Sequence, residues 1–296
     1  MYPLIERLLV FADSTGPGGG MQTALGLAYG AVVGFSLGLT GGGGSIFAVP
    51  LLVYGLGVRP REATGVSLAA VGATALVGGL RRLARGEIEV RTGLLFAVAG
   101  MIGAPGGTWL GSQLPDVLLL ILFALLMVAV AVRMWVQAER RPADAQAIRA
   151  TSGAVADAQG PSCRRDPSGK LHLTSRCFAV LLISGVVAGV LSGLFGVGGG
   201  FVIVPALVLV TGMGIHRAVA TSLLVIALIS TSGVASSIVA GRPLPLALAG
   251  LFLAGGIGGM EMGTLASRRL GGAGLQKLFA SAMVAVAIFI VIKSLV

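Results

Sequence analysis

Long apolar stretches, separated by short polar connections, run along most of the 296-residue chain. The apolar positions are continuous, which favours membrane-spanning helices and excludes a β-barrel, whose strands alternate lipid-facing with lumen-facing residues. The pattern predicts five segments in each half of the chain. They cover residues 21–40, 45–57, 63–80, 93–113 and 117–136 in the first half, and 178–195, 200–214, 218–240, 244–266 and 275–296 in the second.

The two halves repeat each other at a spacing of 155 residues, the distance from Gly41 to Gly196. Self-similarity at a fixed spacing indicates a duplicated unit. We therefore predict membrane repeats at 21–136 and 178–296, an N-terminal segment (1–20) lying at the membrane surface, and a polar linker (137–177). Other identities at this spacing pair Gly30 with Gly185, Gly34 with Gly189, Gly38 with Gly193, Pro50 with Pro205, and Ser67 with Ser222.

The second segment of each half is too short to cross a membrane core about 30 Å thick at about 1.5 Å per residue. We expect it to pair with the first segment as a broken or re-entrant helix. The predicted fold class is therefore an all-α polytopic membrane protein with two repeats. Each repeat has a first helix pair broken at glycine and three further helices.

Composition and charge support a membrane protein with inverted repeats. Apolar residues make up 55% of the chain and charged residues 11%, whereas soluble domains carry about 25% charged residues. The net charge of +10 is spread over loops, which favours a positive-inside topology over nucleic-acid binding. The basic clusters occupy non-equivalent loops, so the halves must be inverted if both clusters are cytoplasmic. They are Arg81, Arg82, Arg85 and Arg91 in the first half, and Arg268, Arg269 and Lys277 in the second.

The linker is polar, basic and without apolar periodicity, so we expect it to be flexible, to lie in the cytoplasm and to leave room for a soluble partner. Both termini then face the periplasm. The two cysteines of the chain, Cys163 and Cys177, lie in this stretch, and reduced thiols are expected in the cytoplasm. The basic residues of the linker are Arg140, Arg141, Arg149, Arg164, Arg165, Lys170 and Arg176.

Two glycine runs occupy equivalent places in the repeats. Consecutive glycines break a helix, and in lipid the freed N–H groups are tolerated only where they line a cavity. The break leaves the next segment beginning with exposed N–H groups and a positive dipole end, which favours an anion. Close packing or a hinge is the alternative, and a nucleotide P-loop is excluded because no Gly-Lys-Ser/Thr follows. The runs are Gly41, Gly42, Gly43, Gly44 and Ser45, and Gly196, Val197, Gly198, Gly199 and Gly200.

Hydroxyl groups and one carboxylate are further candidates. Ser67, Thr221 and Ser222 begin the third segments and could donate to an anion, or else bond their own helix carbonyls. Glu261 is the one carboxylate inside an apolar segment, which makes it a candidate proton-coupling group unless it is paired. Arg268 lies two turns further along the same predicted helix.

Catalysis and metal binding find little support in the sequence. The chain has two histidines, His172 in the linker and His216 at a segment start, and no carboxylate pair or Ser/His/Asp set within the apolar segments. We therefore expect no enzyme activity, no metal site and no cofactor.

The two stretches around the glycine runs resemble the duplicated signature of the sulfite exporter TauE/SafE family. They read GFSLGLTGGGGSIFAVPLLVYGLGVRPREATGVSLAAV and GVLSGLFGVGGGFVIVPALVLVTGMGIHRAVATSLLVI. The resemblance implies transport of sulfite or small organosulfonates across the bacterial inner membrane, commonly outward. One departure is that Val66 precedes Ser67 where Thr221 precedes Ser222. The matching positions are Gly41 to Ser45, Pro50, Ser67, Gly196 to Gly200, Pro205, Thr221 and Ser222.

The sequence thus predicts an alternating-access carrier of a small sulfur-containing anion, held between the glycine runs by backbone N–H groups and by hydroxyls of Ser45, Ser67, Thr221 and Ser222. Three alternatives stay open. They are a passive anion channel, an uptake permease for another small anion, and a membrane enzyme or sulfur-relay protein that uses Cys163 and Cys177.

Overall fold

The structure, a computed structural model, describes most of both predicted repeats. The predicted N-terminal segment lies outside the described residues except for its last two, and so does most of the linker. The described residues are 19–140, 164–165, 171–172, 175–241, 244–267 and 273–295.

Both repeats are helical, as the hydropathy pattern predicts. The first comprises α2 (Gly19–Thr40), a 3-10 turn η2 (Gly43–Phe47), α3 (Ala48–Pro50), a π-helical turn η3 (Leu51–Gly55), α4 (Pro60–Ala84), α5 (Val90–Gln113) and α6 (Asp116–Arg140). The second comprises α8 (Ser175–Phe195), α9 (Gly200–Thr211), α10 (Ile215–Val239), α11 (Leu246–Ser267) and α12 (Ala273–Leu295).

The structure refines the predicted boundaries at two places. Helices α6 and α8 take residues from both ends of the predicted linker, in which β1 (Arg164–Arg165) and β2 (Leu171–His172) pair antiparallel. The second segment of the first repeat is three short turns of different pitch, whereas α9 is one helix. Among the described residues, seven helices are long and apolar enough to cross a membrane.

The outer faces of the bundle carry large apolar side chains. Ile102, Leu125 and Leu246 are about 70% exposed, at 72%, 69% and 70%. Soluble proteins rarely expose apolar side chains over a continuous surface. These faces therefore suit contact with lipid.

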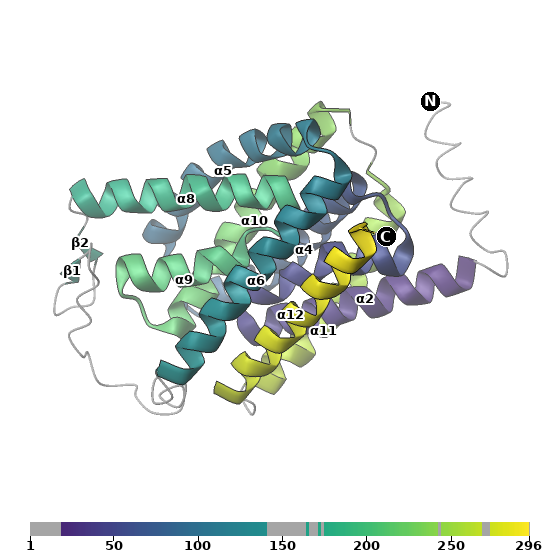
Figure 1. The fold of residues 1–296 in the computed structure, drawn as a ribbon. Helices are drawn as coiled ribbons and strands as arrows, with labels where there is room; N and C mark the ends of the chain where they lie inside the picture. Colours follow the sequence, from purple (N-terminus) through teal and green to yellow (C-terminus); the bar gives the residue numbers. More distant parts are fainter. Residues whose placement is uncertain are drawn as a thin grey trace.

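The first helix of each repeat packs against the fourth helix of the other repeat, so α2 lies beside α11 and α8 beside α5 (Figure 1). Gly30 faces Phe252 and Gly34 faces Gly256, so α2 and α11 run parallel. A methyl group on Gly34 would collide with the facing backbone. The glycines that the repeat alignment brings out thus permit close helix contact.

Equivalent helices of the two repeats pack antiparallel. In the α4·α10 pair, Gly72 faces Ser230 and Gly233 faces Leu68, so the residue numbers run in opposite directions. In the α6·α12 pair, Lys277 near the start of α12 lies 5.4 Å from the ring centre of Trp135 near the end of α6. This antiparallel packing agrees with the predicted inversion of the two repeats, which stays a prediction. The placement of this bundle in a membrane stays a prediction.

Candidate anion site at the two glycine breaks

The two glycine breaks lie against each other inside the bundle. A methyl group on Gly200 would lie 2.6 Å from Gly42 Cα, and one on Gly42 would lie 2.9 Å from Gly200 Cα. Real Cβ atoms do not approach other heavy atoms so closely, so the two backbones are in direct contact. The prediction that both breaks converge on one place agrees with this contact.

Each break begins with a glycine in the left-handed region. Gly41 and Gly196 both have φ of 72°, a conformation that L residues rarely adopt. A side chain on Gly41 would strike Val219, and one on Gly196 would strike Thr64. Val219 and Thr64 are themselves 155 residues apart, so the environments of the breaks repeat along with their sequences.

The helical turns after the breaks begin without caps. The N-cap residues, Gly42 of η2 and Gly199 of α9, provide no side-chain cap. Gly44 N–H donates to Thr40 Oγ1 at 3.0 Å. Among the described residues, however, the N–H groups of Gly42, Gly43, Gly198 and Gly199 donate no hydrogen bond. Uncapped N–H groups of this kind bind anions at helix N-termini.

Three of the predicted ligand hydroxyls form hydrogen bonds with backbone groups, two of them with carbonyls of the first break. Ser45 Oγ donates to Gly42 O at 2.8 Å, and Ser222 Oγ donates to Gly41 O at 2.6 Å. Thr221 Oγ1 accepts from the N–H of Glu89 at 3.1 Å. In this structure, the hydroxyls of Ser45, Thr221 and Ser222 therefore bond the surrounding backbone.

Four other serine hydroxyls are buried without a partner among the described residues. Ser67, the equivalent of Ser222, is fully buried on α4. Ser36, Ser192 and Ser230 are at most 3% exposed, and the repeat pattern did not point to them. A buried polar group without a partner costs about 1–3 kcal/mol, so such groups call for an explanation.

No residue nearest to the break glycines carries a formal charge.

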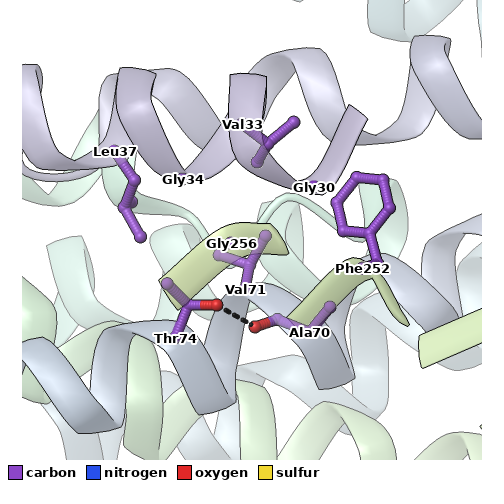
Figure 2. A pocket seen from close by; sticks show the side chains of 9 residues that line it. All are labelled: Gly30, Val33, Gly34, Leu37, Ala70, Val71, Thr74, Phe252 and Gly256. Atoms are coloured by element: carbon purple, nitrogen blue, oxygen red, sulfur yellow. Dashed lines mark hydrogen bonds between the residues drawn. The ribbon is translucent and has the colours of Figure 1, made fainter. Parts of the chain in front are cut away.

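Beside the breaks, a cavity of about 10 Å³ lies between α2, α4 and α11, lined by apolar groups and Thr74, whose hydroxyl donates to Ala70 O (Figure 2). Such a volume accommodates about one water molecule. Val71, which lines this cavity, also lies beside Gly198. This cavity is too small to hold an oxyanion.

Comparison with known proteins decides the family. The model of the sulfite exporter TauE/SafE family matches residues 26–290, which is most of the chain. The chain belongs to the sulfite exporter TauE/SafE family.

Similar proteins are named as transporters. A probable membrane transporter protein of Xylella fastidiosa (strain 9a5c) is 34% identical over 270 residues, which cover 90% of this chain and 93% of the relative. The probable membrane transporter protein YunE of Bacillus subtilis (strain 168) is 28% identical over 211 residues, covering 69% and 74%. No solved structure matches. This TauE/SafE protein is a multi-pass membrane transporter.

Glu261 of this TauE/SafE protein forms an ion pair with Arg81. The pair connects α11 of the second repeat with α4 of the first, and the two side chains are 45% and 53% exposed. Arg268, which lies two turns after Glu261 on the same predicted helix, lies outside the described residues. Because Glu261 is paired and does not contact the break glycines, it is separate from the candidate anion site.

The cysteine prediction does not hold for Cys177, which is disulfide-bonded and fully buried at the start of α8. Cys163 lies outside the described residues. Within the described part of the chain, no three His, Cys, Asp or Glu side chains are placed to hold a metal ion.

Proposed function

We propose that this TauE/SafE protein is a secondary transporter that moves a small sulfur-containing anion, sulfite or an organosulfonate, out of the cell. The observation that carries the proposal is the meeting of two uncapped glycine breaks from opposite repeats. An anion between them would accept hydrogen bonds from the N–H groups of Gly42, Gly43, Gly198 and Gly199, and from the Ser67 hydroxyl. Donors without fixed cations hold an anion less tightly than arginine would, which suits rapid release.

Alternating access would follow from movement of one repeat against the other. The direct contact of Gly42 with Gly200 is a closed arrangement, and the anion would occupy the space that forms when these breaks separate. Because equivalent helices run antiparallel, the same small motion can open the site toward either side in turn. A passive channel would instead need a continuous open path.

Counterflow in proteoliposomes tests the carrier mechanism. Unlabelled sulfite or methanesulfonate inside the vesicles should accelerate uptake of the labelled anion if the protein is a carrier. The binding site of a carrier returns to the outer side faster with unlabelled anion bound, whereas a channel shows no acceleration. Ser67→Ala should weaken apparent affinity by about 10-fold to 100-fold, since it removes one donor to a charged ligand. Thr74→Val is the matched control, because this α4 hydroxyl bonds its own helix. Equal loss in both variants would contradict a ligand role for Ser67.

We also propose that the bundle sits in the bacterial inner membrane with the linker in the cytoplasm and both termini in the periplasm. The α4–α5 connection contains Arg85 and is flanked by Arg81 and Arg82 before it and Arg91 after it. It would face the cytoplasm with the linker. The connection between α5 and α6 would then face the periplasm.

Thiol labelling of intact cells checks this orientation. In a chain without its natural cysteines, Gln113→Cys should react with a membrane-impermeant maleimide added outside, and Glu87→Cys should react only after permeabilisation. Both positions are exposed, at opposite ends of α5. The reverse labelling pattern would overturn the orientation while leaving the repeat architecture unchanged.

A further inference from the structure

Three partnerless serines surround the breaks, and each comes from a different helix. Ser36 of α2 contacts Gly44, so closely that a methyl group on Gly44 would collide with it. On α8, Ser192 Cβ lies 3.4 Å from where a Cβ on Gly199 would stand. On α10, Ser230 Oγ lies 3.4 Å from the corresponding position on Gly198. The three serines thus lie around the two breaks, Ser36 at the first and Ser192 and Ser230 at the second, and the breaks meet at Gly42 and Gly200.

The serine hydroxyls and the backbone N–H groups at the breaks supply hydrogen-bond donors, and few acceptors there are without a partner. Backbone N–H groups cannot accept a hydrogen bond. The carbonyls of Gly41 and Gly42 already accept from Ser222 and Ser45. The carbonyl of Gly199 accepts from the first turn of α9. The backbone N–H of Glu89 donates to Thr221, and the carboxylate of Glu89 accepts from Thr92.

We infer that Ser36, Ser192 and Ser230 complete the anion site, and that this donor-only site selects fully ionised oxyanions over anions that carry a proton on oxygen. The inference rests on the proposed function. A fully ionised sulfonate offers only acceptor oxygens and satisfies every donor. A protonated phosphonate must direct its own O–H group at a donor, which cannot accept it, or at a serine oxygen. In the second case that serine hydroxyl no longer donates to the phosphonate.

A matched pair of ligands separates these cases. Methanesulfonate and methylphosphonate have nearly the same shape, and in mildly acidic buffer both are monoanions, but only the phosphonate keeps a proton. A ligand that leaves a buried donor unpaired loses about 1–3 kcal/mol, so methanesulfonate should bind the purified protein about 10-fold to 100-fold more tightly. Ligand-induced shifts in thermal unfolding, titrated over concentration, give both affinities.

Serine variants link the selectivity to these hydroxyls. Ser192→Ala and Ser230→Ala should each weaken methanesulfonate binding by about tenfold and narrow its advantage over methylphosphonate. Ser237→Ala is the control, because this buried α10 hydroxyl already donates to Gly233 O at 2.9 Å. It should bind both ligands as the unmodified protein does.

Three outcomes would overturn the inference, and one would also remove the proposed function. Equal affinity for the two ligands, with intact methanesulfonate counterflow, would refute the selectivity and leave the carrier standing. Unchanged binding in both serine variants would refute the ligand role of these hydroxyls. Failure to bind or transport either anion or sulfite would refute the inference together with the proposed cargo.

Discussion

Replacing Gly200 by alanine should abolish counterflow while leaving a folded, purifiable protein. The added methyl group would lie 2.6 Å from Gly42 Cα and 2.7 Å from Ile226 Cδ1. It would therefore occupy the position where the breaks meet and where we place the anion. Overpacking of this kind costs about 1–3 kcal/mol, equivalent to as much as a 100-fold loss in affinity.

Helix propensity works in the opposite direction, which makes this substitution informative. Alanine is about 1 kcal/mol better than glycine within a helix, and Gly200 is the first residue of α9. A glycine that served only local helix geometry should tolerate alanine. Gly258→Ala on α11 is the control, because no atom outside its own helix lies within 4 Å of the new methyl group. Normal counterflow by Gly200→Ala would place the anion elsewhere.

The sequence predicts the repeat architecture because duplication imposes the same helix order and the same small residues twice. Helix bounds follow from hydropathy and from the glycine runs. The close crossing at Gly34 follows from small residues in apolar segments, since only they allow backbones to touch. The sequence does not predict which helix packs against α2 or α8. The contacts of α2 with α11 and of α8 with α5 depend on tertiary packing.

The state of each hydroxyl could not be predicted, because hydrogen-bond partners come from distant parts of the chain. Ser222 donates to a carbonyl 181 residues away, while its equivalent Ser67 has no partner. Ser36 and Ser192 miss the 155-residue register by one position, and Ser230 aligns with Ala75. A search for symmetric pairs therefore finds Ser67 and Ser222 but passes over the other serines.

Neutralising one member of the Arg81–Glu261 pair should lower the stability of the protein slightly, and neutralising both should restore it. Glu261→Gln leaves the Arg81 guanidinium without its partner between α4 and α11. Breaking a fully buried pair costs about 3–5 kcal/mol. Because both side chains are about half exposed, water screens the pair, and we expect the free energy of unfolding to fall by no more than about 1 kcal/mol. The double variant Arg81→Gln/Glu261→Gln should recover most of this loss, which thermal unfolding in detergent measures.

Transport by the double variant distinguishes a connecting role from proton coupling. If the pair only connects the repeats, the double variant should regain counterflow and should still respond to an imposed pH gradient. If Glu261 carries the coupled proton, counterflow should return but acceleration by the gradient should not. Glu139→Gln is the control, because Glu139 pairs with Lys277 at 3.6 Å with similar exposure, but between α6 and α12 rather than between α4 and α11. We expect the first result, since Glu261 contacts Arg81 and no break glycine.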